Sequence, residues 1–247
     1  MAREETTIAA ADGDCATWVF TPDQGAGPWP AVIFFMDALA IRPALFDMAQ
    51  RLADGGYVVV LPDLFYRFGP YEELDPAAVF ASENPRSAFA PMMETIDGPK
   101  AAKDTTALLA YLDTRGDVAG NKVGTTGYCM GGGLALHAAA AHPERVGAAA
   151  SFHGGRLATD NETSPHKVVS QITGRVYIGA ADNDGSYPPE QAALLCQTLM
   201  EGHVDFRHEL YPGAAHGWTM PDFPIYDQAG SDRHFDELFR MFGETLT

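Results

Sequence analysis

Basic residues are scarce in this chain: 16 lysines and arginines stand against 33 aspartates and glutamates, and the formal net charge at pH 7 is −17. Nucleic acids and anionic membrane surfaces repel a protein with that charge. We therefore expect neither a nucleic acid nor a membrane as a partner. A small anionic substrate stays compatible with the composition, because a single cleft can be locally positive.

Cysteine is also rare. Cys15, Cys129 and Cys196 are an odd number of cysteines without C-x-x-C spacing. This pattern argues against a disulfide framework or a zinc site and is typical of a reducing compartment. The segment from Met1 to Glu5 is acidic and polar, so we do not expect it to be a signal peptide. The sequence thus predicts a cytoplasmic protein without a metal or cofactor.

Residues 123–143 contain no lysine, arginine, aspartate or glutamate, and the run is long enough to raise the question of a membrane span. Five glycines and the polar Thr125 and Thr126 within it argue against a span. We expect a buried strand, a turn and a helix there instead.

The length of 247 residues fits a single domain over 1–247. Residues 6–21 alternate in polarity and predict a hairpin that turns at Asp12-Gly13. After it, predicted strands and helices alternate, which indicates a mostly parallel central sheet with helices on both faces. The strands are expected at 31–36, 57–61, 122–126, 146–152, 175–180 and 206–211, and the helices at 43–54, 99–114, 132–141, 189–201 and 231–245.

Residues 65–98 interrupt this alternation. They are irregular, aromatic and rich in proline, and they are too many for a plain connection between two elements. We expect this segment to form a lid over a pocket or one of its walls.

Residues 127–131, Gly-Tyr-Cys-Met-Gly, have the spacing of the nucleophile elbow G-x-S-x-G with a thiol in place of the hydroxyl. A short predicted strand at 122–126 precedes them and a helix of small residues follows. A sharp turn from strand to helix exposes the central side chain, and the flanking glycines leave room for the backbone. The pattern favours Cys129 as a nucleophile; an inert cysteine in a glycine-rich turn is the alternative.

Four polar residues follow predicted strands: Asp37, Cys129, Asp182 and His216. Ligands bind beyond the carboxyl ends of the strands in sheets of this kind. A thiol needs a base beside it, and the base needs an acid that fixes its tautomer. The chain order nucleophile, acid, histidine is that of the α/β-hydrolases.

The histidine and the acid each have competitors. Among eight histidines, His216 is favoured because it lies in a glycine- and alanine-rich loop after the last predicted strand, whereas His153 could line the pocket. Asp182 is preferred over Asp184 as the acid, because Asp184-Gly185 is typical of a turn.

With these residues in place, the chain resembles the dienelactone hydrolases, α/β-hydrolases that use Cys-His-Asp in place of Ser-His-Asp. The resemblance extends over most of the chain and implies the α/β-hydrolase fold. It rests on Phe34 to Ala38, Leu61-Pro62-Asp63-Leu64, Gly127-Tyr128-Cys129-Met130-Gly131-Gly132, Gly179-Ala180-Ala181-Asp182 and Gly213-Ala214-Ala215-His216.

The resemblance implies a role for each matching residue. Cys129 would be the nucleophile, His216 the base and then the acid, and Asp182 the residue that orients His216. The backbone N–H groups of Ala38 and Met130 would form the oxyanion hole.

Two positions depart from the family pattern. Asp37 stands where the family has a glutamate that poises the thiol, so Asp37 is expected to take that role with a shorter side chain. Met220 replaces an arginine that, four residues beyond the catalytic histidine, helps to hold the substrate carboxylate. Arg42, Arg67 and Arg86 could replace that cation.

These features predict the hydrolysis of a small ester or lactone through an acyl-thioenzyme, with that substrate as the only expected partner. Phe35, Tyr128, Trp218 and Arg86 are the predicted substrate contacts, although core packing explains the aromatic residues equally well. Two alternatives stay open: a binding or sensing protein without turnover, and a thiol reductant or peroxidase. The sequence makes no prediction of oligomeric state.

Overall fold

The computed structural model describes residues 3–246, and within them eight strands form one sheet in the order β1-β2-β4-β3-β5-β6-β7-β8. β1 and β2 pair antiparallel with each other, β2 is antiparallel to β4, and the remaining pairs are parallel. The strands are β1 (Arg3–Ala10), β2 (Gly13–Phe20), β3 (Trp29–Phe35), β4 (Val58–Pro62), β5 (Val118–Tyr128), β6 (Val146–Phe152), β7 (Arg175–Asn183) and β8 (Phe206–Ala215).

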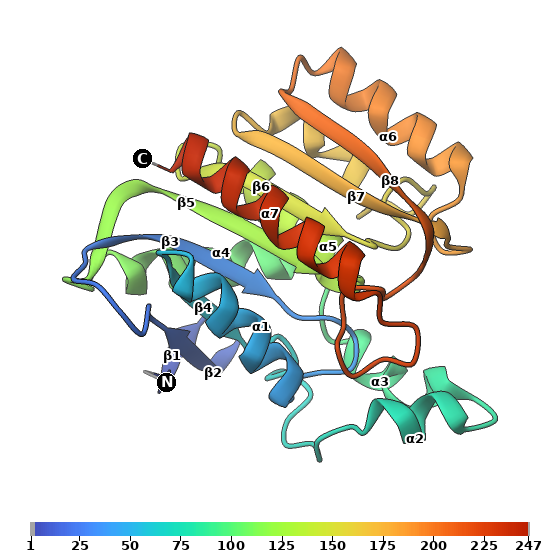
Figure 1. The fold of residues 1–247 in the computed structure, drawn as a ribbon, viewed down its shortest axis with the longest axis horizontal. Helices are drawn as coiled ribbons and strands as arrows, with labels where there is room; N and C mark the ends of the chain where they lie inside the picture. The colour runs from blue at the N-terminus through green and yellow to red at the C-terminus, as the bar shows by residue number, and fades with distance from the viewer. Residues whose placement is uncertain (1–2, 247) are drawn as a thin grey trace.

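The helices cover both faces of this sheet, which confirms the predicted architecture. In Figure 1, α1 and α7 lie in front of the strands, while α4 and α5 lie behind them. The α-helices are α1 (Pro43–Asp54), α2 (Pro76–Ala81), α3 (Ala90–Met93), α4 (Gly98–Leu112), α5 (Met130–Ala141), α6 (Pro189–Glu201) and α7 (Gln228–Thr245), and three short 3₁₀ helices are η1 (Pro85–Ala88), η2 (Pro165–Lys167) and η3 (Val169–Gln171).

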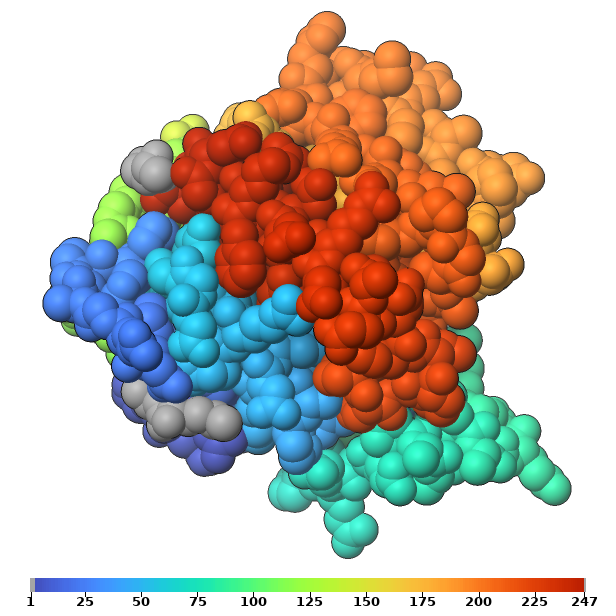
Figure 2. Space-filling model, in the orientation of Figure 1, coloured from blue at the N-terminus to red at the C-terminus, as the bar shows by residue number. Residues whose placement is uncertain are grey.

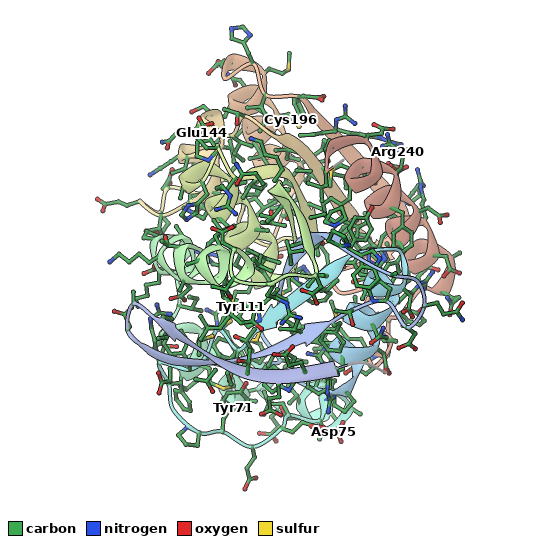
Figure 3. All side chains as sticks on the ribbon, turned by 90° about the vertical axis from the view of Figure 1, so that its left-hand side faces the viewer. Tyr71, Asp75, Tyr111, Glu144, Cys196 and Arg240 are labelled. Atoms are coloured by element: carbon green, nitrogen blue, oxygen red, sulfur yellow. The ribbon has the colours of Figure 1, made fainter. Side chains whose placement is uncertain are left out.

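The central strands are buried because their sequences are apolar on both faces. All five residues of β4 and the last five of β3 are buried, as expected for parallel strands covered on both sides. The β1–β2 hairpin closes one edge of the sheet. Figure 3 shows the hairpin with Tyr111 of α4 close to it, and the Tyr111 hydroxyl donates a hydrogen bond to Glu4 at 3.4 Å.

α1 and α7 are also joined to each other. α1 begins with Pro43, whose fixed φ suits the first helical position, and it ends at Asp54, with Gly55 as the C-cap. Arg51 of α1 forms an ion pair with Asp232 of α7 at 2.7 Å. The pair is exposed, so it adds little to the packing that holds α7, the helix that follows the loop carrying His216.

The uncharged stretch 123–143 is divided between β5, the turn at Cys129 and α5. Among residues 3–246, no helix has the length and apolar character needed to cross a membrane. Met1 and Ala2, the first residues of the segment predicted not to be a signal peptide, lie outside the described residues, as does Thr247.

Residues 65–98 contain the short helices α2, η1 and α3. In Figure 2 this teal segment projects from one end of the molecule beside the orange-red surface that leads into α7. Phe80 of α2 packs edge-on against Phe223 of that neighbouring loop, with ring centroids 4.9 Å apart. The segment therefore lies against the loop that follows His216.

Candidate active site

Cys129 lies at a sharp turn between β5 and α5. Its backbone adopts φ 55° and ψ −115°, which a residue with a side chain rarely takes up. The glycines two positions away are required sterically: a Cβ on Gly127 would lie 2.0 Å from the Gly131 carbonyl oxygen, and one on Gly131 would lie 2.3 Å from the Phe35 oxygen. The sequence pattern therefore identified the turn for the correct physical reason.

His216 follows β8 directly and interacts with both Cys129 and a carboxylate. Its Nδ1 lies 2.7 Å from Oδ2 of Asp184, whose side chain is only 2% exposed. The side chain of Cys129 interacts with the same imidazole and favours its protonated form, in which the ring donates toward the sulfur. Thiol, imidazole and carboxylate are thus in the order that a nucleophile, a base and its orienting acid require.

The choice of Asp182 as the orienting acid is wrong, because the structure brings Asp184 to His216 instead. β7 runs on to Asn183, which pairs with Ala215 of β8, so Asp182 still belongs to the strand. The Asp182 carboxylate is exposed and accepts the N–H of Gly213 at 3.0 Å.

Asp184 does form the turn that the sequence indicated. Its Oδ1 accepts the backbone N–H of Ser186 at 2.8 Å and the Ser186 hydroxyl at 2.6 Å. The other oxygen, Oδ2, remains available for His216. Turn formation and orientation of the imidazole therefore use different oxygens of one carboxylate.

The environment favours the protonated form of His216. Burial opposes a charge there, but Cys129 and Asp184 outweigh burial and raise the pKa of His216 to about 10. Burial likewise opposes the charge of Asp184, yet His216 and Ser186 lower the pKa of that carboxyl. His216 and Asp184 consequently form an ion pair at neutral pH.

A cavity of about 310 Å³ opens beside Cys129 and His216. The segment 65–98 supplies much of its wall through apolar side chains and Arg86. The lining residues are Asp37, Ala38, Leu39, Phe80, Arg86, Phe89, Met93, Cys129, Met130, Gly155, Arg156, Ser186, His216 and Phe223.

The predicted aromatic contacts are wrong: Phe35, Tyr128 and Trp218 are each 0% exposed and do not line this cavity. Tyr128 packs against Phe34 at an interplanar angle of 30°, and its hydroxyl lies 3.1 Å from His234 Nε2, while Trp218 packs on Tyr211. They are core residues, the alternative that the sequence left open. Among the four predicted substrate contacts, Arg86 is the one that reaches the cavity.

The sequence predicted a wall from residues 65–98 but did not identify Phe80, Phe89 and Met93 within it, and it missed Phe223 and Arg156. The density of aromatic residues in 65–98 was the available signal. It indicated a wall without showing which side chains face inward, because that depends on contacts with the distant loop around Phe223.

The predicted oxyanion-hole residues, Ala38 and Met130, both line the cavity. Met130 is the first residue of α5, where the helix dipole favours negative charge. Their positions beside Cys129 suit the stabilisation of an oxyanion by backbone N–H groups.

Asp37 also lines the cavity, but its carboxylate is engaged by Arg42. Arg42 donates from Nη1 to Oδ1 at 2.7 Å and from Nη2 to Oδ2 at 2.8 Å. Oδ1 accepts the Leu39 N–H at 2.9 Å as well. These bonds balance the charge of the carboxylate and tie it to the loop that carries Ala38, while the thiol poising that the resemblance implied stays a prediction.

The guanidinium of Arg42 also occupies the space beside Met220, with Nη2 3.6 Å from the sulfur. Met220 is 0% exposed and does not line the cavity. Arg42 is held by Asp222 at 2.6 Å in addition to Asp37, and Arg67 pairs with Asp12 and Asp104 elsewhere. Neither arginine is available to a substrate.

Among residues 3–246, no group of three or more histidine, cysteine, aspartate and glutamate side chains is arranged to hold a metal ion.

Comparison with known proteins matches residues 15–246 to the model of the dienelactone hydrolase family. A Synechocystis protein provisionally named a carboxymethylenebutenolidase is 27% identical over 225 residues, which cover 89% of this chain and 88% of that protein. A Xenopus tropicalis protein named carboxymethylenebutenolidase homolog is 29% identical over 191 residues, which cover 76% of this chain and 70% of that protein.

The fold is shared with solved structures as well. A Klebsiella pneumoniae protein, provisionally titled a dienelactone hydrolase, superposes with a TM-score of 0.83 over 98% of both chains at 19% identity. At that identity the superposition establishes the α/β-hydrolase fold and nothing finer.

Proposed function

This chain belongs to the dienelactone hydrolase family and is a hydrolase of carboxylic esters or lactones, and we propose that it acts through a covalent thioester on Cys129. The observation that carries the proposal is the contact of His216 with Cys129 on one side and Asp184 on the other, at the wall of a cavity. The catalytic residues proposed are Cys129, His216 and Asp184.

In the first half of the reaction, His216 holds the proton that leaves the Cys129 thiol. The thiolate attacks the carbonyl carbon, and the N–H groups of Met130 and Ala38 bind the resulting oxyanion. When the tetrahedral intermediate collapses, the C–O bond breaks and the leaving alkoxide takes the proton from His216. A lactone leaves its alcohol attached to the acyl chain, whereas an ester releases it.

In the second half, neutral His216 removes a proton from water. The hydroxide attacks the thioester carbonyl, the C–S bond breaks, and the acid leaves as Cys129 regains the proton held by His216. Asp184 keeps the imidazole in one tautomer and stabilises its cationic form in both halves.

The cavity supports a small substrate with an apolar body. Its volume of about 310 Å³ lies at the lower end of ligand-sized pockets. Phe80, Phe89 and Phe223 offer apolar contacts, and Arg86 and Arg156 are exposed at the same wall. The arginines would favour an anionic group on the substrate without requiring one.

The test is turnover of a panel of p-nitrophenyl esters and small lactones by the wild type and by Cys129→Ala. We expect a burst of p-nitrophenol, an acyl adduct on the Cys129 peptide in quenched samples, and neither in the variant. Binding of the same compounds without turnover would favour the sensing alternative. Wild-type turnover that persists in Cys129→Ala would refute the nucleophile.

Cys15, Cys129 and Cys196 are free thiols in the structure. Free thiols are typical of a reducing compartment, which supports the proposal that the protein works in the cytoplasm.

A further inference from the structure

His153 directly follows β6 and lies between the nucleophile turn and the loop of His216. It is 1% exposed, has a positive φ of 39°, and is not used by the proposed chemistry. Its backbone N–H donates to the Gly179 carbonyl at 2.8 Å, which places the ring at the carboxyl end of the sheet.

Both ring nitrogens of His153 have partners on different segments. The backbone N–H of Cys129 is shared between Nδ1 and the Phe152 carbonyl oxygen, each at 3.1 Å, and Nε2 lies 2.7 Å from the hydroxyl oxygen of Thr219. Because Nδ1 accepts a hydrogen bond, it carries no proton. The neutral ring therefore has its hydrogen on Nε2 and donates it to Thr219.

The faces and edges of the ring are packed as well. The centroid of His153 is 5.3 Å from that of His216 and 5.1 Å from that of Trp218, both at steep interplanar angles of 65° and 75°. One side chain thus contacts the backbone of the nucleophile and the ring of the base. Thr219, three residues beyond His216, completes the connection.

Burial and the neighbouring histidines keep this ring uncharged. Burial is the main reason that the pKa of His153 lies well below its ordinary value, and charge on His216 or His234 lowers it further. An imidazolium would place an N–H on Nδ1 against the N–H of Cys129. The observed hydrogen bonds and the environment therefore require the same neutral form.

We propose that His153 is a positioning residue, which couples the turn of Cys129 to the loop of His216 through its hydrogen bond to Thr219. The inference rests on the proposed function, since it concerns the separation of the proposed nucleophile and base. His153 does not line the cavity, so it acts through those residues and not on the substrate.

Three variants remove the two hydrogen bonds of His153, one to Cys129 and one to Thr219, separately. His153→Asn retains an acceptor near the position of Nδ1 and tolerates a positive φ, but it cannot reach Thr219. His153→Gln keeps a polar group near the position of Nε2 and loses the acceptor for Cys129. Thr219→Val removes the hydroxyl at nearly constant volume.

We expect Thr219→Val to lower kcat about tenfold or more while KM changes less than about twofold, because misplaced catalytic groups slow chemistry more than binding. His153→Asn should match it. The double variant should be no slower than either single variant, because both break the same connection. His153→Gln should be slower still, and all three should alkylate with iodoacetamide more slowly at Cys129.

Thr105→Val is the matched control. Thr105 is also 0% exposed, and its hydroxyl donates to the Ala101 carbonyl at 2.8 Å within α4. It should lower Tm about as much as Thr219→Val and leave kcat unchanged.

A Thr219→Val variant with wild-type kcat and alkylation rate would overturn the inference, as would additive losses in the double variant. If Cys129→Ala retained activity, the proposed function would fail first. If Cys129→Ala were inactive and Thr219→Val unaffected, the inference alone would fail.

Discussion

Two buried carboxylates lie at the same end of the sheet, each 2.7 Å from a cationic partner: Asp37 with Arg42 and Asp184 with His216. Asp37 is bound at both oxygens by one guanidinium, and Asp222 holds that guanidinium from the other side. Asp184 uses only one oxygen for the imidazole of His216, which also contacts a thiol.

The chemical difference between the partners decides what each pair can do. Although burial opposes the charge of Arg42, Asp37 and Asp222 raise the pKa of that guanidinium further above its usual range, so Arg42 stays charged. The charge of His216 depends on Cys129 and can change during a reaction. We infer that the Asp37 pair fixes the fold of the oxyanion loop, whereas the Asp184 pair takes part in proton transfer.

The difference between the two pairs is tested most strongly by removing the reactive side chains of Cys129 and His216. Cys129→Ala and His216→Ala should each lower ester hydrolysis by about a thousandfold or more, and the double variant should be little worse, because each group is ineffective without the other. Measurement of kcat/KM on one ester tests this. Clearly additive losses would show that the two residues do not act as a unit.

The same comparison predicts that Cys129 is the cysteine modified first by iodoacetamide. It lies at the cavity, whereas burial raises the pKa of Cys15 to about 12 and also raises that of Cys196. Mass mapping after brief labelling gives the order of modification. Preferential labelling of Cys15 or Cys196 would contradict the assignment.

Arg42→Met should destabilise the fold far more than the loss of an exposed cation. It leaves the Asp37 carboxylate, 1% exposed, without a cation, and an unpaired buried charge costs about 3–5 kcal/mol. Urea unfolding measures the loss. The control is Arg51→Met at the exposed pair with Asp232, which should cost about 1 kcal/mol or less. Equal losses would mean that the Asp37 pair is not structural.

Asp184→Asn should lower kcat about a hundredfold, since an amide can hold the imidazole in the wrong tautomer and cannot stabilise its charge. Asp182→Asn should have little effect, because that carboxylate is exposed and its hydrogen bond goes to the backbone of Gly213, away from the imidazole. Steady-state kinetics of the pair decides between them. A larger loss at Asp182 would make Asp182 the orienting acid after all.

How far the sequence predicts the structure is clearest at these residues. α1, α6 and β6 begin and end at the predicted residues, since proline at helix starts, glycine after helices and apolar runs are local signals. The turn at Cys129 was equally predictable because its glycines are required by contacts within a few residues.

The acid was not predictable in the same way. Asp182 and Asp184 are two residues apart, and their roles depend on how far β7 pairs with β8, which ends at Ala215 more than 30 residues later. Likewise, Phe35 and Phe80 are both phenylalanines near the site, yet only tertiary packing places Phe80 at the cavity and Phe35 in the core.

His216 should titrate far above an ordinary histidine, with a pKa of about 10. Asp184→Asn should lower the pKa of His216 and Asp182→Asn should not, as followed by NMR of the imidazole.

Because the pKa of His216 is raised in the folded state, protonation of His216 stabilises the fold. This contribution to the free energy of unfolding is complete below the unfolded pKa of about 6.5 and is lost as pH rises through about 10. The stability advantage of wild type over His216→Gln should fall across that window. Titration of His216 near 6.5 would remove the basis for the reactive pair.

The smallest effect is expected at two arginines of the cavity wall that, unlike Arg42, have no ion pair among residues 3–246. Arg86 and Arg156 are exposed at the cavity wall, where solvent weakens their attraction to a carboxylate. An exposed charge pair contributes about 0.2–1 kcal/mol, so the wild type should prefer an acidic lactone over its methyl ester by no more than about fivefold. Arg86→Gln and Arg156→Gln should reduce that preference and leave kcat/KM for the neutral ester unchanged. Arg51→Gln, which removes an exposed cation paired with Asp232 away from the cavity, is the control and should leave the preference as it is. A wild-type preference of about a hundredfold would correspond to roughly 2.7 kcal/mol, the strength of a desolvated charge-assisted contact. The cavity would then have to close over the substrate and bury these guanidinium groups as Arg42 is buried now.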